Sequence, residues 1–358
     1  KEKDGTFIQN ELRPFIQDLD VLPFPDWDIW DIEKYIRRGG CVRDSLTVLA
    51  SRGCFHQCAF CAAPAVDRAV PGRYYRLRSP EKVVEEIERN YERYRERGLR
   101  YSFFYDYTFG ACPDHFERLM ELFRDRGLHR GLPWLCETRP EVVTAGWARE
   151  AARSGCLAVV LGIESIHDQI RNEVLNKNVE TAQIYSAMKN LEDNNVDYML
   201  NMMIGTPGET IRSMNESIAF VRRARPIKTF YSFYLPLPGT ALYSESEDSM
   251  LTHADMKYDD GFLNKKNIRL KSIHPVVFAV MTAGIAVHKC ACFILNGLRL
   301  RGGRFVRDLF VFLRGGNTCV GFPNPYFINE LYQQTVLKYF LEDRAAEYRA
   351  KEDCVTEE

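Results

Sequence analysis

Three cysteines, Cys54, Cys58 and Cys61, lie within eight residues in the spacing Cys-x3-Cys-x2-Cys. The flanking Gly53 and Pro64 indicate a loop rather than a packed helix or strand. Three thiolates complete neither a tetrahedral zinc site nor an iron–sulfur cluster whose irons are all bound by cysteine. A 4Fe–4S cluster held by three cysteines keeps one iron open to a further ligand. The spacing therefore predicts a metal centre that binds a small molecule at an open iron.

Two other interpretations of these cysteines carry less weight. A zinc site would need a fourth ligand such as His56, but the spacing matches no common zinc pattern. An accidental cluster of core cysteines is disfavoured by the loop-forming residues around it. The chain has eleven cysteines, an odd number, and at 358 residues it is too large to need disulfides for stability. We therefore expect a reducing compartment and a cytoplasmic location.

The segment from residue 45 to 235 alternates short apolar runs with longer amphipathic ones. The apolar runs predict strands at 45–50, 101–105, 134–137, 157–163, 197–204 and 229–235. The amphipathic runs predict helices at 79–97, 113–126, 140–154, 168–194 and 209–223. Such alternation predicts an α/β fold with a parallel sheet and right-handed crossovers. Periodicity leaves open whether the sheet is doubly wound or forms a part-barrel.

Polar or turn-forming residues follow each of the first five predicted strands. In chain order they are the three cysteines, Asp106, Glu137, Glu164 and the turn at 205–209. Parallel α/β folds place their sites at the carboxyl ends of the strands. We therefore expect one site on that rim. Glu137 and Arg139 are interpreted either as facing substrate or cofactor, or as a surface ion pair.

The cysteine spacing, with the aromatic Phe60 directly before Cys61, resembles the signature of the radical S-adenosylmethionine (SAM) superfamily. The resemblance extends over about residues 42–240 and implies a (β/α)6 partial TIM barrel. It also implies a 4Fe–4S cluster on Cys54, Cys58 and Cys61 that cleaves SAM reductively to start radical chemistry. The six predicted units agree with that fold.

The same resemblance assigns cofactor-binding positions at later strand ends, namely Phe60, Asp106, Glu164, Ser165, Lys177 and Asn201. Residues 161–165 are similar to the fourth-strand motif, which places Glu164 beside SAM, and Lys177 would pair with its carboxylate. Asn201 would contact the ribose, because an amide both donates and accepts hydrogen bonds. Asp106 would lie near the methionine amino group. For Glu164, the alternative is a helix-capping or salt-bridged side chain.

Residues 1–44 do not follow the strand–helix alternation, and the segment at 22–26 is rich in proline. This stretch resembles the connector between a cobalamin-binding domain and the radical domain in cobalamin-dependent members, which implies methyl transfer or oxidative cyclisation. Because the sequence opens with Lys1, we expect an upstream portion that carries the cobalamin domain. We divide the chain into a connector (1–44), a radical SAM core (45–244) and a C-terminal helical extension (245–358) with helices near 275–298, 303–314 and 325–349.

Two alternative functions match the sequence less well. A methylthiotransferase resembles the same barrel, but it carries three cysteines upstream of the motif, where this sequence has Cys41. A non-enzymatic iron–sulfur electron carrier would bind every iron through protein and needs no six-unit rim. The expected partners are a small-molecule or peptide substrate and a reductant such as flavodoxin or ferredoxin. A net charge of −1 gives no sign of nucleic-acid binding, and the longest apolar stretch, 275–287, is too short to span a bilayer.

Overall fold

The computed structural model describes residues 10–38, 44–234, 236–246 and 338–355. Its main sheet consists of β1 (Ser45–Val48), β4 (Tyr101–Phe104), β5 (Trp134–Thr138), β6 (Cys156–Glu164), β7 (Asp197–Ile204) and β8 (Lys228–Phe233). Every strand of this sheet runs parallel to its neighbour. The six strands lie side by side in the order in which they occur in the chain. A doubly wound sheet reverses its strand order at a switch point. The uninterrupted order decides between the two folds left open by the sequence and confirms the (β/α)6 partial TIM barrel.

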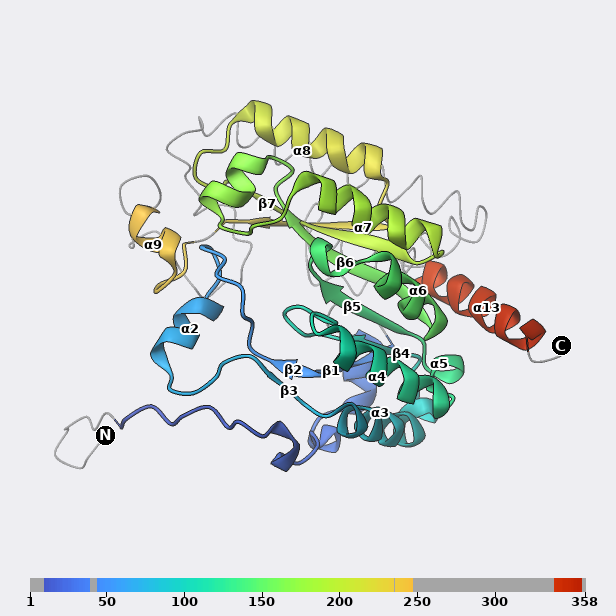
Figure 1. The fold of residues 1–358 in the computed structure, drawn as a ribbon. Helices are drawn as coiled ribbons and strands as arrows, with labels where there is room; N and C mark the ends of the chain where they lie inside the picture. Colours follow the sequence, from blue (N-terminus) through green and yellow to red (C-terminus); the bar gives the residue numbers. More distant parts are fainter. Residues whose placement is uncertain (1–9, 39–43, 235, 247–337, 356–358) are drawn as a thin grey trace, which may run out of the picture.

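Five helices connect these strands and lie around the outside of the curved sheet (Figure 1). They are α3 (Pro80–Tyr94), α4 (Pro113–Asp125), α6 (Ala145–Arg153), α7 (Thr181–Asp193) and α8 (Ile211–Ala224). The start of α3 follows the sequence prediction, because the Ser79 hydroxyl accepts the Lys82 amide at 3.3 Å and Pro80 occupies the first position. The helix buries Val83, Val84 and Ile87 against the sheet, as its apolar spacing predicts.

Two predicted helices are shorter than expected. The first turn at 140–154 is a 3₁₀ turn, η4 (Pro140–Val142), and α6 begins only after Thr144, whose hydroxyl accepts the Trp147 amide at 3.1 Å. The continuous helix predicted at 168–194 was wrong. A π-helical turn, η5 (Gln169–Val174), is separated from α7 by a loop. The reason is Arg171, whose fully buried guanidinium binds the carbonyls of Val179 and Ser165 and so shapes the loop around itself.

Several short elements were not predicted, because they are too short for a periodic pattern. They are η1 (Leu19–Val21), η2 (Trp27–Ile29), α1 (Ile32–Arg38), β2 (Ser51–Arg52), α2 (Ala63–Ala69), β3 (Arg76–Leu77), η3 (Arg95–Arg97), α5 (Leu128–Gly131) and α9 (Ala241–Ser246). Strands β2 and β3 pair in antiparallel fashion. Together with α2 they support the two sides of the cysteine loop.

The N-terminal segment packs along α3. The Asp20 carboxylate accepts the Ser79 amide at 3.0 Å, and Tyr94 donates to Asp28 at 3.0 Å. The half-buried Phe24 ring lies 5.2 Å from the Lys82 ammonium, a cation–π contact. These contacts tie the segment to the barrel wall, which is the packing that a connector needs. A connection to an upstream domain stays a prediction.

The C-terminal helix α13 (Lys338–Val355) lies against α5 and β6, near the amino ends of the strands (Figure 1). Arg344 pairs with Asp197 at the start of β7, Nε to Oδ2 2.6 Å, and Tyr348 donates to the Arg153 carbonyl at 2.9 Å. Of the predicted helix at 325–349, the described part begins at residue 338. The helices predicted at 275–298 and 303–314 lie outside the described residues. In the part of the chain that the structure describes, no helix is long and apolar enough to cross a membrane.

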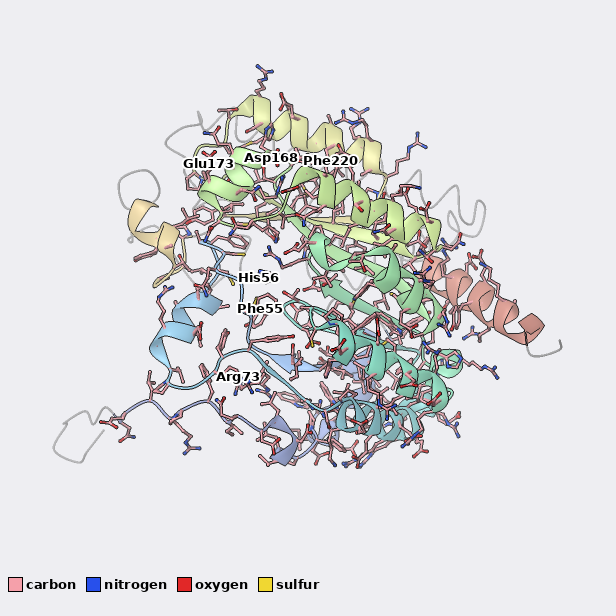
Figure 2. The ribbon with its side chains drawn as sticks, in the orientation of Figure 1. Phe55, His56, Arg73, Asp168, Glu173 and Phe220 are labelled. Carbon is pink, nitrogen blue, oxygen red and sulfur yellow. The ribbon has the colours of Figure 1, made fainter. Side chains whose placement is uncertain are left out.

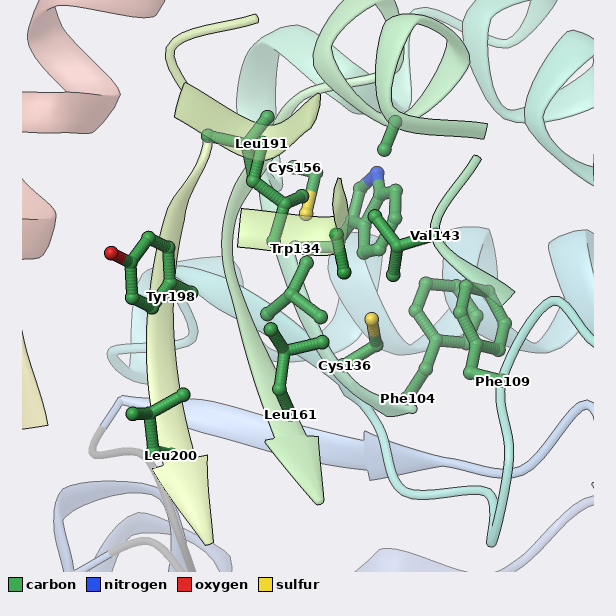
Figure 3. Packing of buried hydrophobic residues seen from close by; sticks show 14 of the residues in the cluster. Phe104, Phe109, Trp134, Cys136, Val143, Cys156, Leu161, Leu191, Tyr198 and Leu200 are labelled. Atoms are coloured by element: carbon green, nitrogen blue, oxygen red, sulfur yellow. The ribbon is translucent and has the colours of Figure 1, made fainter. Parts of the chain in front are cut away.

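The core between sheet and helices is strongly aromatic (Figure 3). Phe104 and Phe109 stack with ring centroids 4.2 Å apart, and Trp134 meets Phe104 edge-on at 5.5 Å. Trp134 is fully buried and donates its indole N–H to the Ser154 carbonyl at 2.8 Å. Burying one such side chain contributes about 1.5–3 kcal/mol. Cys136 and Cys156 are also buried here, as expected of free core cysteines.

Candidate active site

The cysteine loop follows β2 at the carboxyl ends of the strands, which we call the carboxyl rim. Gly53 begins the loop with φ +83°, and a Cβ at this position would lie 2.3 Å from the Tyr74 carbonyl oxygen. A side chain is therefore excluded here by both conformation and space. Cys58 is buried, whereas Cys54 and Cys61 are half-buried. The loop thus presents three thiols of one motif at the edge of the barrel.

Each cysteine sulfur has a polar neighbour. The Cys54 sulfur lies 3.8 Å from the Thr108 hydroxyl, the Cys61 sulfur accepts the Ala63 amide at 3.4 Å, and the Cys58 sulfur accepts Arg139 Nη1 at 3.3 Å. Burial raises the pKa of the Cys61 thiol, and the neighbouring Cys58 and Cys54 raise it further. The Cys61 thiol therefore senses the other two cysteines of the motif.

The donor set fits a cluster better than a single ion. Within residues 10–38, 44–234, 236–246 and 338–355, no three His, Cys, Asp or Glu side chains gather closely enough to hold one metal ion. In a 4Fe–4S cluster each cysteine binds a different iron, so its sulfurs stand apart. Three thiols on one loop, beside the cations of Arg139 and Lys177, suit an anionic cluster.

Glu164 and Lys177 form an ion pair at the end of β6. The pairing of β6 with β7 shifts register between Gly162 and Glu164, and Glu164 has φ +65°, a left-handed conformation that is costly for glutamate. Lys177 Nζ lies 3.3 Å from Glu164 Oε1, and the lysine side chain is only 5% exposed. A Cβ on Gly162 would lie 3.0 Å from that carboxylate oxygen, so the glycine leaves room for the pair. The salt bridge considered for Glu164 is therefore present, and its partner is the predicted cofactor ligand Lys177.

Glu137 and Asn201 belong to the same face of the sheet as Glu164. Burial, and then the nearby Glu164, raise the pKa of Glu137 to about 7. Asn201 pairs in register with Gly162 and is half-buried, whereas Leu200 and Met202 on either side of it are buried. Because side chains alternate along a strand, Asn201 points to the opposite face from those two. This face therefore carries one amide and two carboxylates close to the rim.

Asp106 and Ser165 have local partners instead. Asp106 is 2% exposed, its Oδ2 accepts the Ala50 amide at 3.2 Å and its Oδ1 accepts the Ser51 hydroxyl. Burial raises the pKa of this carboxyl to about 6. The Ser165 hydroxyl accepts the His167 amide at 3.2 Å. Both residues thus shape the loops next to the cysteines, and a direct contact of either with the cofactor stays a prediction.

Phe60 is half-buried against the hydrophobic core, so this aromatic residue anchors the end of the cysteine motif. His56 lies on the same loop beside Phe55, with ring centroids 4.3 Å apart (Figure 2). Its Nε2 is buried without a hydrogen-bond partner. Burial, and then Arg139 and Lys177, lower the pKa of His56 to about 4. A neutral imidazole therefore lies on this loop, at the residue that the sequence analysis considered only as a zinc ligand.

Residues 48–221 match the family model described as the Radical SAM superfamily. The domain formed by residues 48–221 belongs to this superfamily. Its members use a 4Fe–4S cluster and SAM, and the chain is accordingly an enzyme of the radical SAM type. The matched range begins in β1 and ends in α8, so it covers the cysteine loop, the Glu164–Lys177 pair and Asn201.

The chain is also similar to two curated proteins and one solved structure. It is 27% identical over 259 residues to an uncharacterized methyltransferase of Pyrococcus horikoshii, covering 72% of this chain and 54% of that protein. It is 27% identical over 254 residues to the anaerobic magnesium-protoporphyrin IX monomethyl ester cyclase of Cereibacter sphaeroides, covering 70% and 40%. The fold resembles the radical SAM methyltransferase TsrM of Kitasatospora setae, with TM-score 0.51 and 22% identity over 60% of this chain and 41% of that one. The chain spans about half the length of the curated relatives it matches.

Proposed function

We propose that this chain is the radical SAM core of a cobalamin-linked enzyme that transfers a methyl group or performs an oxidative cyclisation on a small molecule or peptide. Both reaction types occur among the names of its relatives, a methyltransferase and a cyclase. The TsrM structure with the similar fold contains cobalamin and a 4Fe–4S cluster. The proline-rich connector packed along α3 agrees with an upstream cobalamin domain.

The observation that carries the proposal is the position of three thiols next to a buried Lys–Glu pair on one rim. Cys54, Cys58 and Cys61 would hold the cluster. When bound, the cluster supplies one electron that cleaves SAM at its open iron. Lys177 would pair with the SAM carboxylate as the family motif implies, beside its ion pair with Glu164.

Other residues of the same face would orient the rest of SAM. Asn201 would hydrogen-bond the ribose hydroxyls through its amide. Glu164, held near Lys177 by its left-handed backbone, would lie beside the cofactor as the family motif implies. Phe60 packs the motif against the core and would hold the cysteine loop in place beside the cofactor.

The reaction also needs an electron donor and a reducing environment. We assign the donor to the flavodoxin or ferredoxin class, because these proteins deliver single electrons. The cysteines at positions 54, 58, 61, 112, 136 and 156 are free, which agrees with a reducing compartment such as the cytoplasm.

Anaerobic reconstitution tests the cluster assignment. The wild-type chain should bind about four irons, and after reduction it should release 5′-deoxyadenosine from SAM. Cys58→Ala should lose both properties. Cys112→Ala provides the matched control, because Cys112 is a half-buried cysteine of the carboxyl rim that lies outside the motif. A full cluster in the Cys58→Ala protein would show that the ligand assignment is wrong.

A second measurement tests the cobalamin link. The whole protein, with every residue encoded upstream of Lys1, should bind cobalamin and form a methylated or cyclised product, whereas the 358-residue chain should hold the cluster alone. Full turnover by the 358-residue chain without added cobalamin would contradict this part of the proposal.

A further inference from the structure

Arg139 connects the cysteine loop to the loop that carries Lys177. Its side chain follows β5 and is buried, with 5% exposure. Nη1 donates to the Cys58 sulfur at 3.3 Å, Nη2 donates to the Lys177 carbonyl, and Nε pairs with the Glu141 carboxylate. All three nitrogens of one rigid guanidinium are therefore engaged, each with a different segment.

The same two loops are joined by further hydrogen bonds. The Ala59 amide donates to the Leu175 carbonyl at 2.9 Å, and Asn176 Nδ2 donates to the Gln57 carbonyl at 2.7 Å. Asn176 adopts a left-handed conformation with φ +48°, which turns the loop toward the cysteines. Arg139 thus sits within a set of contacts that fixes the Cys58 segment relative to Lys177.

We propose that Arg139 is a positioning residue. Its N–H···S bond to Cys58 raises the reduction potential of the cluster, and its second bond, to the Lys177 carbonyl, fixes the position of Cys58 relative to Lys177. The inference rests on the proposed role of Cys58 as a cluster ligand. Hydrogen bonds to ligand sulfurs stabilise the additional negative charge of the reduced cluster and raise its reduction potential. A higher potential makes the cluster easier for a weak donor to reduce.

The guanidinium geometry distinguishes this role from that of a charge alone. Arginine presents its donors in a planar fork with fixed directions, whereas lysine carries one compact ammonium. The fork lets Arg139 contact a sulfur and a carbonyl of two different loops at once. A lysine in its place keeps the positive charge but loses one of the two contacts.

Three variants of the full chain separate the effect of the positive charge from that of the fork geometry. The reduction potential of the reconstituted cluster is measured by spectroscopically monitored titration. Arg139→Gln removes both charge and fork, and Arg139→Lys removes the fork. Glu141→Gln keeps the arginine but replaces the charged acceptor of its Nε by a neutral amide oxygen. For both Arg139 variants we expect the reduction equilibrium to become about tenfold less favourable, which is about 59 mV for a one-electron couple. Glu141→Gln should shift in the same direction by less. Arg118→Gln, at an exposed ion pair with Glu81 on the outer helices, should leave the potential unchanged.

The outcomes are distinguishable from failure of the proposed function. A wild-type potential in Arg139→Lys would overturn the inference, because charge alone would then explain the contact. If Arg139→Gln does not hold iron, Arg139→Lys and Glu141→Gln decide the question, and wild-type potentials in both overturn it. A full cluster in Cys58→Ala would instead show that the proposed ligand set is wrong. Loss of the cluster in Cys58→Ala together with unshifted Arg139→Lys and Glu141→Gln proteins would overturn only the role of Arg139.

Discussion

Polar residues at the two ends of the barrel differ in their hydrogen-bond partners and backbone conformation. At the amino ends of the strands, Asp197 pairs with Arg344 at 2.6 Å, Trp134 donates to Ser154 at 2.8 Å, and the Tyr198 hydroxyl donates to the Ala224 carbonyl at 2.6 Å. At the carboxyl rim, Glu164 is held in a left-handed conformation and the His56 Nε2 is buried without a partner. These three side chains at the amino ends have hydrogen-bond or ion-pair partners, whereas the two rim groups carry a local free-energy cost.

The comparison indicates which groups are held in place at a cost in folding free energy. A left-handed glutamate and a buried polar atom without a partner each cost about 1–3 kcal/mol. Such costs persist only where the surrounding structure imposes them, and these two lie close to the thiols and the Glu164–Lys177 pair. Removing buried side chains from the amino end should therefore lower the free energy of unfolding, whereas removing side chains from the carboxyl rim should affect ligand binding first.

The largest effect on folding is expected from Trp134→Ala. Trp134 is fully buried in the aromatic core and hydrogen-bonded, so its loss should lower the free energy of unfolding by about 3–5 kcal/mol. Urea titration measures this change. Tyr107→Ala is the matched control, because this aromatic residue of the carboxyl rim is 62% exposed and should change stability by less than about 0.5 kcal/mol. Equal losses in the two variants would contradict the contrast between the two ends.

Lys177→Ala should affect ligand binding rather than folding. A charge-assisted hydrogen bond is worth about 1.5–3 kcal/mol, so the affinity for SAM should fall by about 10- to 100-fold. Iron content should stay at the wild-type level, because Lys177 contacts no cysteine sulfur directly in the described contacts. Calorimetric titration of SAM gives the affinity, with Lys189→Ala on the exposed face of α7 as control. Wild-type affinity in Lys177→Ala would exclude the carboxylate role.

Glu137 should make stability depend on pH. Its pKa is raised from 4.5 to about 7, so the folded chain binds more protons than the unfolded chain between these values. The stabilising contribution is full below about pH 4.5 and is lost as the pH rises through 7. Glu137→Gln cannot ionise, and relative to the wild type its free energy of unfolding should increase by about 2 kcal/mol between pH 5 and pH 8.

Urea titrations of both proteins without SAM, at the two pH values, measure the difference. Glu96→Gln provides the control, since the Glu96 side chain is 89% exposed. Parallel pH profiles for wild type and Glu137→Gln would show that the environment of Glu137 does not penalise its charge.

The smallest effect is expected from Arg344→Ala. This change removes the partner of Asp197, a pair whose side chains are both about one quarter exposed, so the loss should be only about 1 kcal/mol. Affinity for SAM should remain unchanged, because α13 lies near the amino ends of the strands, away from the carboxyl rim. A tenfold change in SAM affinity would instead indicate that the amino ends of the strands are energetically coupled to the carboxyl rim.

The sequence predicted the features that depend on local patterns. The six strands, the Ser79 cap and the cysteine loop follow from periodicity, capping residues and spacing, and the structure contains each of them. The break in the predicted 168–194 helix could not be predicted from the sequence, because it depends on the buried contacts of a single arginine, Arg171. The contact of Arg139 with Cys58 joins residues 81 positions apart. Spacing says nothing about such a pair until the fold brings β5 next to the cysteine loop.

The strand order has a mechanical consequence. In a closed barrel the number of strands and their stagger fix the radius, because hydrogen bonds run around the whole circumference. In the described sheet, β1 and β8 are the two ends of the strand order, so this constraint is absent along one side. The sheet can change its curvature by small adjustments of strand twist without breaking a ladder bond. The width of the sheet's interior is therefore not fixed by hydrogen bonds around a closed circumference.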